Sequence, residues 1–309
     1  MSAIHLGLTP WDFSQTNAQA FAEQARFAES CGYQSFWLPE FHFGADALPD
    51  PMLVLASIAA STTSIKLATS SYLLPLRNPL LAAEQVALLD QLSNGRVILG
   101  VGRGFSKETL HAFDIQPSTK RQVFEWCLGK MIDAWRGEPV SLHDDGSSAV
   151  TVRPLPVQQP HPTIWVAAFG PKALSQAGRL GLPYLASPIE TFDVLSKNYQ
   201  VFDQAIVEAG KDHPLERPIM RSIYLTESKS ALKAVREQLE RSKPPRGLET
   251  APNIDDWAIV GDRAFVRDQV ARYREAINAT HLIVTRLRIG DFEGTDFKAS
   301  IEKIAETLA

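Results

Sequence analysis

A short segment near residue 100 has the residue types of an anion-binding site. Residues 97–99 form an unbroken apolar run, which is typical of a strand buried on both faces. The next five residues, 100–104, are three glycines, a valine and Arg103. Glycine lets the backbone approach a ligand closely, and a guanidinium forms charge-assisted hydrogen bonds with phosphate. We therefore expect Arg103 to bind a phosphate group rather than to pair with a carboxylate at the surface.

A second segment with anion-binding character lies at residues 163–181. Its pattern predicts a strand, then a tight turn at Gly170, then a helix that begins at Pro171. The N–H groups of a first helical turn attract anions, and Lys172 adds a positive charge beside them. The same residue types would also suit an ordinary turn between a strand and a helix.

Acid–base chemistry is possible at residues 36–44, where Glu40 and His42 follow a predicted second strand. A histidine titrates near neutral pH and can transfer protons. The alternative is that Glu40 and His42 form a structural hydrogen-bonded pair. The predicted ends of the first three strands also carry aromatic residues, which would form either an apolar pocket or part of the core. These residues are Trp11, Phe13, Trp37, Phe41, Phe43 and Tyr72.

The elements that position these residues alternate between strand and helix along the whole chain, as in βα units with a parallel sheet. Eight strands are predicted, near residues 4–8, 35–38, 65–74, 97–101, 163–168, 183–186, 219–225 and 281–286. This number indicates a single (β/α)8 TIM barrel domain over residues 1–309, with its active site at the carboxyl ends of the strands. An open doubly wound sheet is the alternative, but no G-x-G-x-x-G motif follows the first strand.

Two predicted connections are longer than a βα unit needs, and they span residues 104–162 and 227–280. The first contains a predicted helix over residues 120–135 and an extended stretch near Val150. The second includes residues 243–253, whose prolines and glycine in a long connection are typical of a lid. We expect that segment to be mobile without ligand and to become ordered when ligands bind.

The composition is that of an ordinary globular protein, with 45% hydrophobic and 21% charged residues. A formal net charge of −4 without long like-charge runs argues against nucleic acid or a membrane as a partner. Cys31 and Cys127 do not form a metal-binding pair, so no metal site is expected. No apolar run could span a bilayer, and the chain starts with a strand-like segment, so we expect a cytoplasmic protein.

Residues 88–104, LLDQLSNGRVILGVGRG, resemble the bacterial luciferase-like flavin monooxygenase family. The resemblance extends from LGLTP near the start of the chain to AIVGD near its end. It implies a TIM barrel that binds a flavin, with Arg103 and Arg121 at the flavin phosphate. It also implies a non-proline cis peptide at Ser70–Ser71 that supports the flavin ring.

The same resemblance implies further phosphate contacts from the loop that holds Phe169, Gly170 and Lys172. Two departures from the family pattern are visible. Family members often have hydroxyl side chains in this loop, where this chain has Phe169 and Lys172. They also commonly carry Glu-His-His after the second strand, where this chain has Glu40, Phe41 and His42. Because Phe41 replaces the histidine assigned acid–base duty in luciferase, aldehyde oxidation is in doubt, and we expect His42 not to be an obligatory base.

The resemblance implies a monooxygenase that uses reduced FMN and O2 to oxidise a small, largely apolar organic substrate. A separate flavin reductase would supply the reduced flavin, since the chain has no nicotinamide-binding motif. The family usually forms homodimers through helices near the second and third strands. Two alternatives stay open: hydride transfer with F420 as the cofactor, and a non-catalytic flavin-binding homologue. The arginine among the glycines favours FMN over F420.

Overall fold

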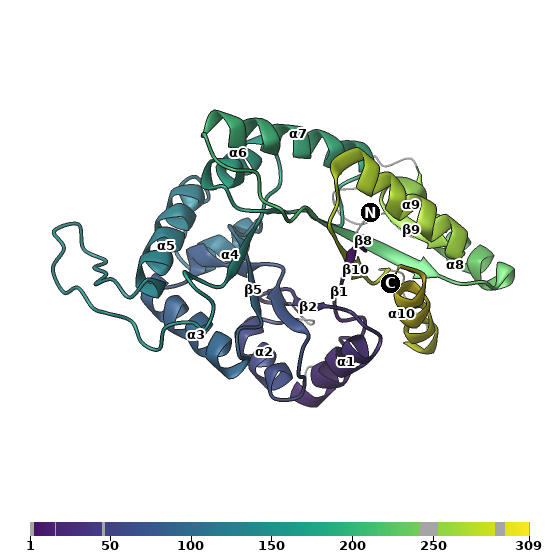
Figure 1. Cartoon of the computed structure of the whole chain (residues 1–309), viewed down its shortest axis with the longest axis horizontal. Helices are drawn as coiled ribbons and strands as arrows, with labels where there is room; N and C mark the ends of the chain where they lie inside the picture. Colours follow the sequence, from purple (N-terminus) through teal and green to yellow (C-terminus); the bar gives the residue numbers. More distant parts are fainter. Residues whose placement is uncertain (1–2, 16, 45–46, 242–252, 288–293, 309) are drawn as a thin grey trace. The chain divides into compact units, whose positions relative to one another are not determined.

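The computed structural model describes residues 3–15, 17–44, 47–241, 253–287 and 294–308 (Figure 1). Their order is an alternation of strands and helices, and every pairing between the strands named below is parallel. The expected α/β class is therefore confirmed. The proposed lid at residues 243–253 lies outside the described residues, apart from Asn253.

The chain divides into two compact units, which are described separately. The central unit comprises Thr16–Ala22 and Leu38–Ala167, and the terminal unit comprises Met1–Gln15, Glu23–Trp37 and Ala168–Ala309. Helix α1 (Ala18–Ser30) contributes residues to both units.

The central unit is built on three parallel strands, β3 (Lys66–Thr69), β5 (Val97–Gly102) and β6 (Thr163–Ala167), with β5 in the middle. The short strand β4 (Tyr72–Leu73) also pairs with β5. Its remaining elements are, in chain order, α2 (Pro51–Ala59), η1 (Leu74–Leu76), α3 (Pro79–Leu92), α4 (Lys107–Ala112) and α5 (Lys120–Trp135). The loop after α5 projects beyond α3 and α5, and Val140 and Val150 pair within it (Figure 1).

The terminal unit contains the parallel strand order β2 (Ser35–Leu38), β1 (His5–Leu8), β10 (His281–Thr285), β8 (Pro218–Leu225) and β9 (Ala258–Gly261). A short strand, β7 (Tyr184–Leu185), follows α6 (Pro171–Leu180). Helices α8 (Lys229–Arg241), α9 (Arg263–Ile277) and α10 (Gly294–Leu308) flank β8 and β9 (Figure 1). The remaining elements are α7 (Phe192–Glu208) and η2 (Ile254–Asp256).

Local sequence signals explain where many of these elements begin. The Asn78 side chain accepts hydrogen bonds from the N–H groups of Leu80 and Leu81, and Pro79 occupies the first turn of α3, where a missing N–H costs nothing. Asp50 caps α2 in the same way. Gly95, with a φ of 78°, follows α3 in the left-handed conformation that glycine adopts readily.

The strand prediction needs two corrections. The strand expected at residues 65–74 is two strands, because the chain turns at Ser70 and Ser71 between β3 and β4. The connection expected at residues 227–280 contains an additional strand, β9, directly before the Asp262 cap of α9. Its four residues are all buried. In the sequence, so short an apolar run cannot be distinguished from part of a helix or loop.

The motif at residues 88–96 has a structural role in the central unit. Arg96 is buried and donates hydrogen bonds to the backbone oxygens of Ala59, Ile65 and Ser93. The buried Asp90 carboxylate accepts from the backbone N–H and side-chain amide of Gln158. These two residues thereby join α2, β3, α3 and the loop before β6, and they hold the amino end of β5, where the Val97 N–H donates to Asp90.

Candidate active site

The carboxyl end of β5 carries a group of cations, of which Arg103 is buried and Lys120 and Arg121 are half-buried. Arg103 is buried, its Nη1 donates to the Ala167 oxygen at the end of β6 (3.0 Å), and its guanidinium lies 4.8 Å above the Phe124 ring. Lys120, at the start of α5, donates to the Gly104 oxygen at 2.7 Å. Arg103 was expected from its glycines and Arg121 from the family resemblance, whereas Lys120 was missed because neither signal marks it.

The electrostatics of this group favour a negatively charged ligand. Burial, followed by the neighbouring Arg121 cation, lowers the pKa of Arg103 to about 10. Burial, followed by Arg103 and Arg121, also lowers the pKa of Lys120. Each positive charge makes its neighbours harder to protonate, so a bound anion would offset the repulsion among all three. The three cations together form a site suited to a phosphate group.

The turn after β3 lies beside this cation group. The Ser70–Ser71 peptide bond is cis, at the position that the resemblance implied. The Ser70 N–H donates to the Leu38 oxygen at 2.8 Å, which places the turn near the end of β2. A side chain on Gly102 would collide with the Ser71 hydroxyl, so the close approach of this turn to β5 requires glycine at that position.

Helix α6 in the terminal unit begins as expected. Gly170 precedes Pro171 with a φ of 81°, and no side chain caps this amino end. Phe169 and Lys172 are both exposed. The geometry agrees with an anion site at the first turn of the helix and assigns no ligand to it.

Glu40 and His42 do form a hydrogen-bonded pair, with His42 Nε2 2.8 Å from Glu40 Oε1. The structure adds two partners that the sequence analysis missed. Arg77 Nη2 lies 2.8 Å from Glu40 Oε2, and the Leu73 N–H donates to the same oxygen at 3.0 Å. The Glu40 side chain is 0% exposed, so this carboxylate is the buried centre of a small polar network. Arg77 precedes the Asn78 cap of α3, and a lone arginine at that position carries no local signal of its partner.

Five of the six aromatic residues separate into two groups, while Phe13 is half-buried with the Arg286 guanidinium 4.6 Å from its ring centroid. Trp11, Trp37 and Tyr72 are buried and belong to the core, and burial raises the pKa of the Tyr72 phenol. Phe41 and Phe43 are exposed, the latter at 71%. The Phe43 ring stacks on Phe113 at 5.7 Å, and Phe113 meets the His42 ring edge-on at 5.1 Å. Only the exposed group is available to contact a ligand.

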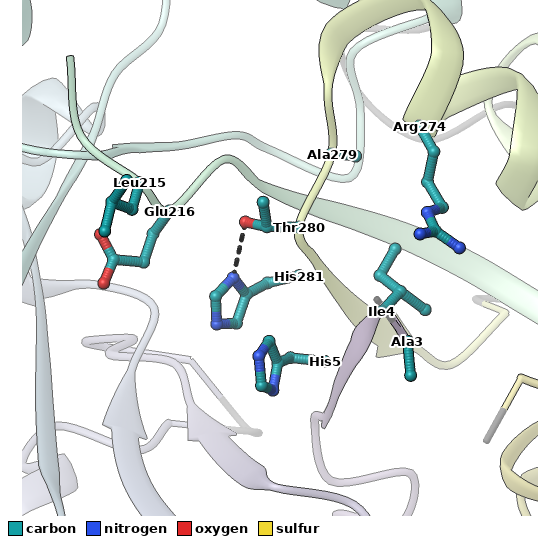
Figure 2. Close-up of a pocket in the computed structure, with 9 residues that line it drawn as sticks. All are labelled: Ala3, Ile4, His5, Leu215, Glu216, Arg274, Ala279, Thr280 and His281. Atoms are coloured by element: carbon teal, nitrogen blue, oxygen red, sulfur yellow. Dashed lines mark hydrogen bonds between the residues drawn. The ribbon is translucent and has the colours of Figure 1, made fainter. Parts of the chain in front are cut away.

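A cavity of about 230 Å³ lies elsewhere, at the amino ends of β1 and β10 (Figure 2). The rings of His5 and His281 stack in it with their centroids 4.7 Å apart. Burial, followed by the proximity of His5, lowers the pKa of His281 to about 4. Because the active site of this fold class forms at the carboxyl ends of strands, the cavity is not the active site.

The described residues contain no group of three or more histidine, cysteine, aspartate or glutamate side chains that could hold a metal ion. In the same part of the chain, no helix is long and apolar enough to cross a membrane.

The chain has sequence relatives among known proteins. The protein y4vJ of Sinorhizobium fredii is 31% identical over 313 residues, which cover 91% of this chain and 87% of y4vJ. The alkanal monooxygenase alpha chain of Photorhabdus luminescens is 28% identical over 66% of this chain and 57% of its own length. The oxygenase component of flavin-dependent trigonelline monooxygenase from Acinetobacter baylyi is 27% identical over 69% and 62%. The matches to these two enzymes therefore span less than two thirds of their length.

Solved structures share the fold. Monooxygenase RslO1 from Streptomyces bottropensis has a TM-score of 0.82 at 24% identity, covering 99% of this chain and 98% of its own. The oxygenating constituent of 3,6-diketocamphane monooxygenase from Pseudomonas putida, in complex with FMN, has a TM-score of 0.84 at 20% identity, with coverage of 100% and 98%. The F420-dependent tetrahydromethanopterin reductase of Methanopyrus kandleri has a TM-score of 0.69 at 18% identity, with coverage of 100% and 99%.

The luciferase-like monooxygenase family matches residues 5–280, which include the whole central unit and the terminal unit up to the start of β10. The chain is therefore an enzyme that belongs to the luciferase-like monooxygenase family.

Proposed function

We propose that this chain binds reduced FMN and uses O2 to oxidise a small, largely apolar organic substrate. The observation that carries the proposal is the group of Arg103, Lys120 and Arg121 at the carboxyl end of β5, where a terminal phosphate would be held. When bound, the reduced flavin supplies the electrons that reduce O2. The protein would bind and orient the cofactor, with Ser70 and Ser71 beside the ring.

The residues present fit FMN. Arg103 is buried, Lys120 and Arg121 are half-buried, and the cations repel one another beside glycine backbone, which is the donor set that a phosphate monoester takes. The uncapped amino end of α6, with Phe169, Gly170 and Lys172, is a second set of groups that we assign to flavin binding. Exposed aromatic rings at Phe41 and Phe43 would contact an apolar substrate and help to exclude water.

A comparison of FMN with riboflavin tests the phosphate site. Arg103→Ala should weaken FMN binding by about 10- to 150-fold, because a charge-assisted hydrogen bond contributes about 1.5–3 kcal/mol. Riboflavin binding should change little, since riboflavin lacks the phosphate. Arg136→Ala is the control, because Arg136 is exposed and lies at the far end of α5. Equal losses for both ligands would show that Arg103 does not contact the phosphate.

F420-dependent hydride transfer is the second candidate, because the F420-dependent reductase of Methanopyrus kandleri shares the fold. Mass spectrometry of the ligand released from natively purified protein distinguishes FMN from F420. Oxygen uptake with preformed reduced FMN distinguishes either enzyme from a non-catalytic flavin-binding protein.

The trigonelline relative is named an oxygenase component, which supports a separate flavin reductase as partner here. The chain alone should then fail to oxidise NADH in the presence of FMN, and addition of a flavin reductase should start O2 consumption. NADH oxidation by the chain alone would contradict the two-component arrangement.

We also propose a homodimer and a single catalytic domain with a closed (β/α)8 barrel. Helices α2 and α3 carry four exposed leucines, Leu53, Leu81, Leu88 and Leu92, which a second subunit would cover. Light scattering of wild type and Leu88→Asp tests the dimer. The match of one family to residues 5–280 supports a single domain that includes both units.

A further inference from the structure

We propose that Arg77 is a positioning residue, which supplies the counter-charge of Glu40 so that His42 remains a neutral imidazole and offers Nδ1 as a hydrogen-bond acceptor. The acceptor would serve a polar group of the substrate or flavin. The use of that acceptor rests on the proposed function, whereas the protonation pattern itself does not.

The first step is the burial of Glu40. Its side chain is 0% exposed, and it has three partners: the imidazole of His42, the guanidinium of Arg77 and the N–H of Leu73. A buried carboxylate is costly unless it is paired and hydrogen-bonded. One full positive charge in contact is enough to compensate it, and either Arg77 or a protonated His42 could supply that charge.

The second step is that Arg77 is fixed in place to supply it. Its guanidinium lies 4.0 Å above the Tyr72 ring, whose hydroxyl is hydrogen-bonded to Gln85. Its backbone N–H donates to the oxygen of Leu74, the first residue of η1. The 2.8 Å approach of Nη2 to Glu40 Oε2 lacks the angles of a hydrogen bond, so the pair acts chiefly through charge. That is the property a counter-charge needs.

The third step concerns the proton on His42. Because the Arg77 cation compensates the negative charge of Glu40, the imidazole needs only one N–H hydrogen. That hydrogen is on Nε2, because Nε2 donates to the Glu40 carboxylate. Nδ1 then keeps its lone pair. Among the described residues, no group forms a hydrogen bond with Nδ1, and the ring is otherwise bounded by Phe43 and Phe113. The acceptor is therefore left for a ligand.

Among the described residues, no charged side chain other than Glu40 forms a hydrogen bond or ion pair with the imidazole. Glu40 comes from its own strand end and Arg77 from the end of η1, while the buried Tyr72 of β4 is a neutral phenol. Helix α4 meets the ring through Phe113. The titratable side chains of α4 and the residue that follows Phe113 are exposed to solvent, namely Lys107, Glu108, His111 and Asp114. Without Arg77, the buried carboxylate would draw a second proton onto His42, and Nδ1 would become a donor.

Nitrogen-15 NMR of histidine-labelled protein, free of flavin at pH 7, tests the inference. His42 is assigned by the signals lost in His42→Asn. Wild type should show one protonated and one bare imidazole nitrogen, with Nδ1 bare. Arg77→Gln should shift Nδ1 to the protonated region, and Arg77→Lys should restore the wild-type pattern because it restores the charge. A bare Nδ1 in Arg77→Gln would overturn the inference.

Two further measurements keep the test decisive. If Arg77→Gln does not fold, the wild-type spectrum still decides, because a doubly protonated His42 at pH 7 contradicts the proposal by itself. Arg217→Gln is the matched control: Arg217 also lies above a tyrosine ring and pairs with a carboxylate, and its loss should leave the His42 signals unchanged. Because the NMR sample contains no flavin, the protonation result for His42 does not depend on the outcome of the FMN and riboflavin titrations.

Discussion

Two clusters in this molecule have nearly the same composition and different surroundings. In the central unit, Arg77 lies above Tyr72 and pairs with Glu40, which holds His42. In the terminal unit, Arg217 lies above Tyr199 and pairs with Asp203, which has His213 at 3.5 Å. These two groups are called the Glu40 cluster and the Asp203 cluster below.

The difference between the clusters is burial. The side chains of Glu40 and His42 are 0% and 8% exposed, whereas those of Asp203 and His213 are 35% and 49% exposed. Arg217 binds Asp203 with two hydrogen bonds, at 2.7 and 2.9 Å, and also donates to the Ile277 oxygen. The Asp203 cluster, which is more exposed to solvent, thus has the better hydrogen-bond geometry. Because Asp203 and His213 are accessible to water, their charges are screened, and the Asp203 cluster serves to join secondary-structure elements. The charges of the buried Glu40 cluster are screened less, so they can control the protonation of a neighbouring group.

The largest expected effect comes from removing the buried carboxylate. Glu40→Ala should lower the free energy of unfolding by about 3–5 kcal/mol, because it leaves the Arg77 guanidinium buried without a counter-charge. Asp203→Ala should cost about 1 kcal/mol or less, since water can replace the partly exposed carboxylate. Urea denaturation measures both. A double variant, Glu40→Leu with Arg77→Met, should recover much of the loss. Similar costs at both clusters would contradict the role assigned to burial.

A third histidine, His281, whose ring stacks on His5, extends the comparison. The pKa of His281 is about 4 in the folded chain against an ordinary value of 6.5. Below pH 6.5 the unfolded chain binds this proton before the folded chain does, so stability falls as the pH falls toward 4. The expected slope is about 1.4 kcal/mol per pH unit, and the total is about 3 kcal/mol.

Urea denaturation between pH 7 and 4 measures that slope. His281→Asn should flatten the curve across this range, because it removes the group whose pKa is lowered by folding. An equally steep curve in His281→Asn would show that other groups cause the acid sensitivity.

A smaller effect is expected for catalysis at the Glu40 cluster. His42→Asn should keep FMN affinity and lower single-turnover oxidation less than about tenfold, because the asparagine oxygen can replace Nδ1 as an acceptor. A general base typically contributes about 100- to 10,000-fold. A loss in that range, with FMN binding intact, would identify His42 as the base after all. His213→Asn serves as the control and should have no effect on turnover.

The smallest effect is expected at the arginine of the Asp203 cluster. Arg217→Lys should lower the free energy of unfolding by about 1 kcal/mol, because lysine cannot form the two parallel hydrogen bonds to Asp203. FMN affinity should not change. A large loss of stability would show that this cluster is as important to the fold as the buried one, and chemical denaturation distinguishes the two cases.

Local signals in the sequence predicted the elements that position the site. Asn78 with Pro79 marks the start of α3, and residues 120–135 coincide with α5 (Lys120–Trp135). Capping and periodicity depend on neighbours within a few residues, so they are readable without a fold. The glycines around Arg103 likewise indicated where a ligand approaches the backbone. The cis peptide at Ser70–Ser71 came from the family resemblance and is confirmed. The ligand roles of these residues stay predictions.

The sequence by itself therefore determined the alternation of strands and helices, the family and the segment that ends β5. Only the tertiary structure decided that Arg77 compensates Glu40, that Lys120 joins Arg103, and that Trp37 and Tyr72 belong to the core. The reason is physical. Glu40 and Arg77 are far apart in the chain, and they meet because the Ser70 turn contacts the end of β2 and leads directly into β4, whose Leu73 N–H binds Glu40. Burial then converts ordinary surface residue types into an ion pair whose charges control a neighbouring proton.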